Sequence, residues 1–173
     1  MEEQRKISKL RRRPGFFFKR FQADERGVQL AELAVVMPIF LLLFGDTAEF
    51  GRYFYEYSTL AKAARIGSRY LATAAVNSNQ NTAAKNIVVY GNAAGTGSPI
   101  LNGLSTANVT LTRQGGVSCL PQTVTVQIVN FKHQPVFDLG KLTNIPSLTM
   151  NIDVKPSVTM RYLLTQPALG CAP

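Results

Sequence analysis

The residue of this sequence with the clearest potential for chemistry is Glu32, a lone carboxylate in an otherwise apolar stretch. The stretch runs from Val28 to Gly45, and Ala34 to Phe44 is wholly apolar. A charge at the centre of a membrane-spanning helix costs on the order of 2.5–3.5 kcal/mol on insertion scales, so Glu32 indicates a function that involves a partner. A second interpretation stays open. Glu32 lies only one turn into the stretch, and its carboxylate could reach water at the headgroups of a plain membrane anchor.

The other residues that could do chemistry form no recognisable catalytic or metal-binding set. His133 is the single histidine, and it has no Cys, Asp or Ser companion at motif spacing, so we expect a solvated histidine at a strand end. Asp138 and Asp153 form no recognisable pair for acid–base catalysis. Gly95 to Ser98 lacks the strand, the Lys-Ser/Thr ending and the helix of a phosphate-binding loop. We therefore expect a protein that is not an enzyme and that uses no cofactor and no metal.

Two cysteines, Cys119 and Cys171, follow the apolar stretch. If this part of the chain is exported to an oxidising compartment, a disulfide is their simplest use. On the chain-entropy model, closing a loop of about 50 residues stabilises a fold by roughly 4 kcal/mol. Two unpaired buried thiols are the alternative.

The charge distribution predicts how the apolar stretch is oriented. The formal net charge is +9, and residues 1–27 contribute nine Lys/Arg against four Asp/Glu. A basic leader ahead of an apolar segment is typical of a cytoplasmic end, and we prefer this interpretation to nucleic-acid binding by Arg11 to Arg13. The 18 residues from Val28 to Gly45 would span about 27 Å as a helix, close to the roughly 30 Å of a hydrocarbon core. We expect a transmembrane helix at about 28–45, with everything after Asp46 outside.

The helix is predicted to continue beyond the membrane to residue 76, so that residues 28–76 form one long helix. Pro38 lacks a backbone donor, which predicts a kink or a loosened turn within the membrane. Glu49, Arg52 and Glu56 are expected on the other side of the continuation from the packing face, where opposite charges can pair. The predicted packing face is apolar and has helical spacing; it consists of Phe50, Tyr53, Phe54, Tyr57, Leu60, Ala61 and Ala64. We expect this aromatic face to pack on a sheet.

The junction before the apolar stretch resembles that of type IV prepilins and pseudopilins. In that class a dedicated peptidase cuts after a glycine on the cytoplasmic side, and a glutamate five residues into the mature chain pairs with the freed amine of a neighbouring subunit. The resemblance places the cut after Gly27, makes Val28 the residue that carries the amine, and puts Glu32 at the fifth position. An amine of this kind would supply the opposite charge that a buried carboxylate needs.

The rest of the long helix narrows the resemblance to the TadE-like proteins, which are pseudopilins or minor pilins of the tight-adherence (Tad/Flp) pilus machinery. The similar segments are Met37-Pro38, Phe44-Gly45, Glu49 to Arg52, Ala63 to Tyr70, Lys85 to Asn92 and Met160 to Tyr162.

Residues 77–173 are predicted to form the exported domain. Residues 77–108 read as a loop with one short helix or strand, and Asn77 to Asn81 is expected to end the long helix. Alternation of apolar and polar residues then predicts four strands, at about 107–112, 123–129, 147–154 and 157–163. The expected fold is α+β and pilin-like: a long N-terminal helix whose second half packs on a small antiparallel sheet.

These observations lead to one preferred function and one alternative. The preferred function is a minor pilin or pseudopilin of a Tad pilus, processed after Gly27, in the bacterial inner membrane with a cytoplasmic N-terminus and a periplasmic or extracellular C-terminal domain. Its expected partners are the prepilin peptidase, other pilins and pseudopilins of the system, the inner-membrane assembly platform and the lipid bilayer. The alternative is an uncleaved, single-pass membrane protein with an exported binding domain.

Overall fold

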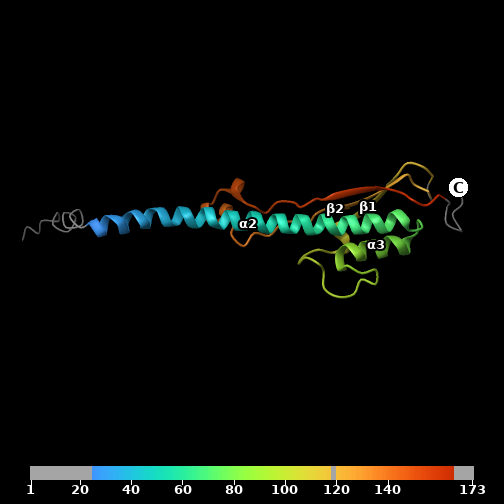
Figure 1. Ribbon diagram of the computed structural model, residues 1–173, viewed down its shortest axis with the longest axis horizontal. Coiled ribbons are helices and arrows are strands. Elements are labelled where there is room, and N and C mark those ends of the chain that lie inside the picture. Colours follow the sequence, from blue (N-terminus) through green and yellow to red (C-terminus); the bar gives the residue numbers. More distant parts are fainter. Residues whose placement is uncertain (1–24, 118–119, 166–173) are drawn as a thin grey trace, which may run out of the picture. The chain divides into compact units, whose positions relative to one another are not determined.

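The computed structural model describes residues 25–117 and 120–165 of the chain. Most of the leader and both residues of the predicted disulfide, Cys119 and Cys171, lie outside the described residues. The fold is α+β, as predicted: a long apolar N-terminal helix is followed by a small antiparallel sheet and a few short helices (Figure 1). In chain order the elements are α2 (Glu25–Thr73), α3 (Ser78–Tyr90), the 3-10 turn η1 (Thr106–Asn108), β1 (Val109–Gln114), β2 (Thr123–Ile128), α4 (Leu139–Thr143), the 3-10 turn η2 (Pro146–Leu148) and β3 (Ser157–Arg161).

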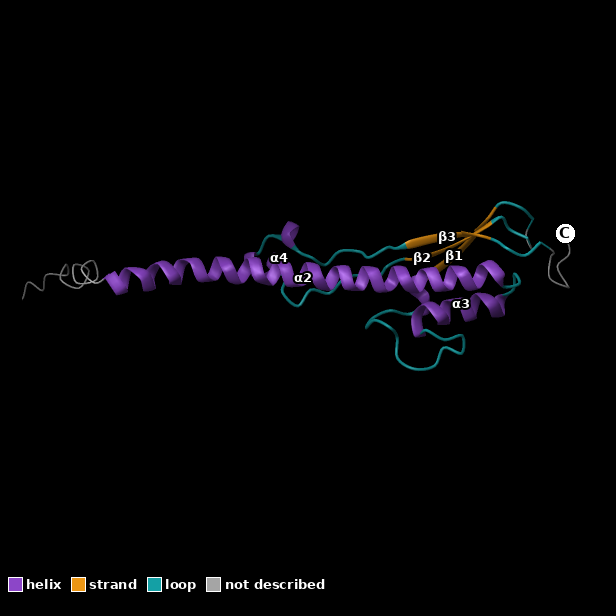
Figure 2. Ribbon diagram, in the orientation of Figure 1, coloured by secondary structure: helices purple, strands orange, loops and turns teal. Residues whose placement is uncertain are grey.

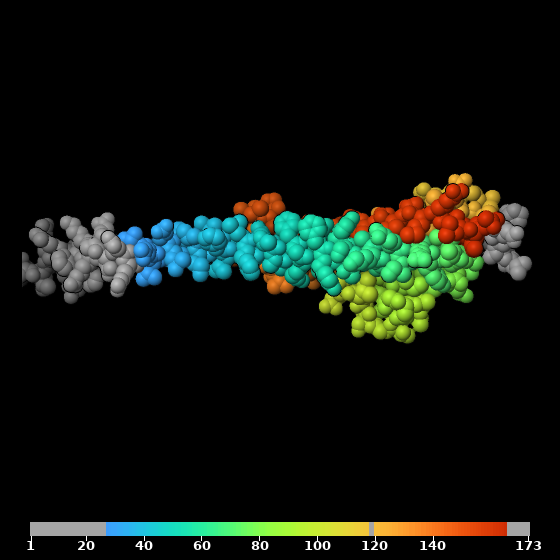
Figure 3. Space-filling model, in the orientation of Figure 1, coloured from blue at the N-terminus to red at the C-terminus, as the bar shows by residue number. Residues whose placement is uncertain are grey.

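The chain divides into two compact units, Met1–Gly45 and Asp46–Pro173, and the border falls where the apolar stretch ends. In the first unit, the described residues form the beginning of α2. This is the one helix among the described residues that is long and apolar enough to cross a membrane. Nearly all of its large apolar side chains are exposed (Figure 3). The helix runs through Pro38 without a break. A kink at Pro38 stays a prediction.

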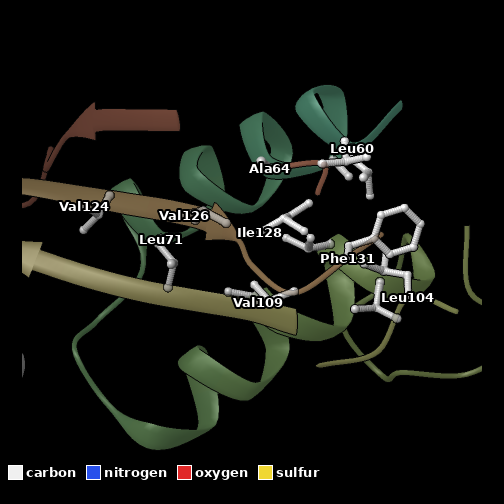
Figure 4. Packing of buried hydrophobic residues seen from close by; sticks show 14 of the residues in the cluster. Leu60, Ala64, Leu71, Leu104, Val109, Val124, Val126, Ile128 and Phe131 are labelled. Carbon is white, nitrogen blue, oxygen red and sulfur yellow. The ribbon is translucent and has the colours of Figure 1, made fainter. Parts of the chain in front are cut away.

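The second unit is built around the C-terminal part of α2, which packs on the sheet. Its core contains Leu60, Ala64 and Leu71 of α2 together with Val126 and Ile128 of β2. Figure 4 shows Leu60 and Ala64 of α2 pointing toward Ile128, and Phe131 closing the same end of the cluster. The predicted packing of the second half of the helix on a sheet is therefore confirmed.

The helix face that packs agrees with the predicted one only in part. Phe50, Phe54 and Tyr57 are 44–62% exposed, so these three aromatic residues are not on the sheet. The other four residues of the predicted face, Tyr53, Leu60, Ala61 and Ala64, are buried or half-buried. From Glu49 onward, the remaining buried or half-buried residues of α2 are Glu49, Glu56, Thr59, Ala63, Gly67, Ser68, Tyr70, Leu71 and Ala72. The carboxylates of Glu49 and Glu56 lie on this face because His133, far away in the sequence, contacts both of them, as described below.

The sheet has three strands in the order β1-β2-β3, and both pairs are antiparallel. Val124, Val126 and Ile128 of the central strand β2 are fully buried and alternate with more exposed residues, as the period of two predicted. The predicted strand at 147–154 is wrong. That segment contains η2 and a single bridge between Asp153 and Lys132, and the chain reaches β3 only after Pro156.

Helix α3 is longer than the short element predicted for this region. Asn77 does not simply end the preceding helix: its side chain accepts a 2.8 Å hydrogen bond from the backbone N–H of Gln80 and so caps α3. Gly91, with φ of 75°, ends α3 in the left-handed conformation that favours glycine. Gly67 allows α2 to approach α3, because a Cβ there would lie 2.5 Å from a methyl group of Val88.

Candidate functional site

The predicted processing and assembly residues lie in the first turns of α2. Gly27, Val28 and Glu32 are all helical, and Val28 and Glu32 are exposed. Four and five residues separate Glu32 from Val28 and Gly27, so the three lie within about 8 Å along the helix axis. The described part of the chain places no cover over Glu32, which leaves its carboxylate accessible to another molecule.

The second unit contains a buried polar cluster that the sequence did not predict, formed by Glu49, Glu56 and His133. Glu49 is only 3% exposed and His133 is fully buried. The Nε2 atom of His133 lies 3.2 Å from Oε2 of Glu49, and its Nδ1 atom lies 2.8 Å from Oε2 of Glu56. Since neutral imidazole has one N–H, both contacts are hydrogen bonds when the ring carries two protons. The ring of Tyr53, 5.8 Å away and nearly perpendicular, packs against the imidazole.

This geometry corrects the expectation that His133 is a solvated histidine at a strand end. His133 lies between the carboxylates of Glu49 and Glu56, which are seven residues, or about two helical turns, apart on α2. The two glutamates precede His133 in the chain by 84 and 77 positions. A signal was present: Glu49, Tyr53, Glu56 and Leu60 have the i, i+4, i+7, i+11 spacing of a single helix face. Nothing in that spacing identifies His133 as the partner.

Glu49 also holds the backbone of the segment after His133. Its Oε1 atom accepts hydrogen bonds from the N–H groups of Val136 at 2.9 Å and Phe137 at 3.0 Å, and Arg52 Nη1 donates at 3.0 Å. Burial alone raises the pKa of the Glu49 carboxyl, but the hydrogen bonds from Phe137, Val136 and Arg52 outweigh it and lower that pKa below its ordinary value. Glu49 is therefore a charged anchor for residues 133–137.

The cluster binds protein groups. The oxygens of Glu49 already accept from two amides, a guanidinium and an imidazole, and both nitrogens of His133 face carboxylates. Among the described residues, no group of three or more His, Cys, Asp and Glu side chains could hold a metal ion. The arrangement fastens one chain segment to a helix.

The other notable surface of the second unit is formed by Phe50, Phe54, Tyr55 and Tyr57 of α2, which the sheet does not cover and which we call the exposed aromatic face. Phe50 and Phe54 stack with ring centroids 6.5 Å apart, and Tyr55 and Tyr57 extend the exposed aromatic surface along α2. Large exposed apolar patches on a protein surface commonly mark contacts with proteins or membranes. This face is available for a contact outside the described chain.

Comparison with known proteins yields one match, in the helix that carries these features. Residues 27–69 match the family model described as TadE-like protein. This segment of the chain is TadE-like. The match begins at Gly27 and includes Glu32, Glu49, Arg52 and the exposed aromatic face. It confirms, over this segment, the resemblance predicted from the sequence. Neither the curated proteins nor the solved structures contain a match.

Proposed function

We propose that the protein is a minor pilin or pseudopilin of a Tad pilus, processed by a prepilin peptidase after Gly27. The TadE-like match over residues 27–69, which begins at the proposed cleavage residue, carries the proposal. The helix that follows is apolar, exposed and long enough to cross a membrane. In the proposed orientation the basic leader is cytoplasmic and Asp46–Pro173 lies outside the inner membrane.

The assembly step is an ion pair between two subunits. Cleavage of the Gly27–Val28 bond frees an amine on Val28, and the carboxylate of Glu32 in a neighbouring subunit provides its counter-charge. The exposed carboxylate of Glu32 and the uncovered apolar helix support this role, because both are accessible to a second helix. The protein is proposed to be structural and not an enzyme, and to meet other pilins and the assembly platform through this helix.

The exposed aromatic face extends the same contact beyond the membrane. Phe50 and Phe54 lie on α2 away from the sheet, so helices that pack along their apolar stretches can continue the contact there. The sheet and the Glu49 cluster occupy a different face of α2, which leaves this one free for a neighbouring pilin.

The intact mass of the chain after extraction from membranes that contain the prepilin peptidase tests the proposal. The expected N-terminus is Val28, and it is expected to stay at Met1 when the peptidase is absent. An intact N-terminus in the presence of the peptidase would contradict the proposal and favour an uncleaved membrane anchor with an exported binding domain.

A matched pair of variants tests the role of Glu32. Glu32→Ala is expected to stay in the membrane but to lose co-purification with the other pilins. Gln29→Ala, which removes a polar side chain one turn earlier on the same helix, is expected to assemble normally. Equal assembly of the two variants would exclude an ion pair at Glu32.

A further inference from the structure

Residues 134–151 form an excursion from the second unit that is closed firmly at its base. The backbone N–H of His133 donates to the carbonyl of Ile152 at 3.0 Å, and that of Val154 donates to Phe131 at 2.8 Å. The excursion contains α4 and η2, joined by irregular chain (Figure 2). We call residues 134–151 the α4 loop.

The contacts with α2 define the direction in which the α4 loop leaves its base. His133 contacts Glu56 and Glu49, and the next contacts, from Val136 and Phe137, are with Glu49 alone. The chain therefore runs along α2 from Glu56 toward Glu49, against the direction of the helix. Glu49 follows Gly45, the end of the apolar stretch, by four residues, or about 6 Å of helix rise.

The α4 loop exposes four large apolar side chains among polar ones. Val136 is 82% exposed and Leu142 63% exposed, and Ile145 and Leu148 are exposed as well. The one acidic residue of the loop, Asp138, is used internally: its carboxylate accepts hydrogen bonds from the N–H of Gly140 and the hydroxyl of Thr149. The four apolar side chains do not belong to the core of the second unit, because they are exposed. The longest helix of the loop, α4, has five residues.

We propose that the α4 loop inserts into the interface of the membrane that α2 crosses, on the side of the exported domain. The proposal rests on the membrane topology given under the proposed function. A bilayer is about 40–45 Å thick with its headgroups and about 30 Å without them, so each headgroup layer occupies about 5–7 Å. The anchor at Glu49 lies within this distance of the end of the apolar stretch. Val136, Leu142, Ile145 and Leu148 are the inserted side chains, and Lys141 meets anionic headgroups.

The absence of tryptophan from the sequence allows a direct test. The full chain is reconstituted in vesicles of phosphatidylethanolamine and phosphatidylglycerol, with and without brominated acyl chains, and carries one tryptophan at a time. Leu142→Trp and Val136→Trp report on the α4 loop, and Phe40→Trp reports on the apolar stretch. Ile66→Trp, at an exposed position of α2 17 residues beyond Glu49, is the aqueous reference.

Brominated lipid is expected to reduce the fluorescence of Phe40→Trp, Leu142→Trp and Val136→Trp and to leave that of Ile66→Trp unchanged. Quenching of Phe40→Trp without quenching of either loop reporter would overturn the insertion of the loop while the membrane span stands. A blue-shifted but unquenched loop reporter would also overturn it, and would show that protein covers the loop. An unquenched Phe40→Trp would overturn the span, and with it the insertion.

Discussion

Removal of the Glu49 carboxylate is the perturbation for which the structure makes the sharpest prediction. Glu49→Ala leaves the amides of Val136 and Phe137 without their acceptor and leaves His133, which is fully buried, with one carboxylate instead of two. A buried hydrogen-bonding group left without its partner typically costs about 1–3 kcal/mol, and more when the lost partner is charged. The N–H of the exposed Val136 can bind water instead, so we expect Glu49→Ala to lower the free energy of unfolding by about 3 kcal/mol, mainly through Phe137 and His133.

The same reasoning predicts much smaller effects for two related variants. Arg52→Gln removes a guanidinium whose side chain is 45% exposed, and exposed ion pairs contribute about 0–1 kcal/mol. Glu49→Gln keeps one acceptor oxygen for the two amides but loses the charge opposite His133. We therefore expect a loss for Glu49→Gln that lies between those of Arg52→Gln and Glu49→Ala.

Chemical unfolding of the detergent-solubilised chain measures the stability of each variant, and hydrogen exchange gives a local measurement. The amides of Val136 and Phe137 are expected to exchange faster in Glu49→Ala, while those of β2 change only as far as the global stability falls. Unchanged exchange at Val136 and Phe137, or equal stabilities for Glu49→Ala and Arg52→Gln, would refute the assignment of Glu49 as the anchor.

Four further predictions concern the pH dependence of stability and helices α2 and α3. Hydrogen bonds lower the pKa of Glu49 in the folded state, so its contribution to stability is full above the ordinary pKa of 4.5 and is lost as the pH falls through the folded pKa. The free energy of unfolding, measured at a series of acidic pH values, checks this prediction. Gly67→Ala places a Cβ 2.5 Å from Val88, and overpacking of this kind costs about 1–3 kcal/mol. Gly51→Ala, whose added Cβ would meet nothing within 4 Å, is expected to stabilise the helix by about 0.5–1 kcal/mol, and chemical unfolding measures both glycine variants. Asn77→Ala removes the cap of α3 and is expected to cost about 1 kcal/mol and to raise exchange in its first turn.

The local pattern of apolar and polar residues was sufficient to predict elements whose conformation depends mainly on their own sequence. The uninterrupted apolar stretch predicted the long helix, and the strict alternation at residues 123–129 predicted β2, because burial of one face imposes a period of two. Alternation at residues 147–154 predicted a strand that does not form. There the chain pairs only at Asp153, and the preceding residues belong to the α4 loop.

The choice of packing face on α2 shows why pattern alone failed elsewhere. The predicted face groups Phe50, Phe54 and Tyr57 with Leu60, whereas the structure buries Leu60 together with Glu49 and Glu56, and both groupings have helical spacing. Hydrophobicity favours the aromatic set. The structure buries the second set, because the cost of burying carboxylates is offset by donors that the helix does not itself contain.

The sequence by itself therefore determined the features that depend on neighbouring residues: the Gly27–Val28 junction, the lone carboxylate of Glu32, and the apolar helix that makes this segment recognisable as TadE-like. Only the tertiary structure decided the role of Glu49 and His133, which lie 84 residues apart. The physical reason is that a hydrogen bond needs its two groups within about 3 Å, and for residues so distant in the chain only the packing of the fold brings them together.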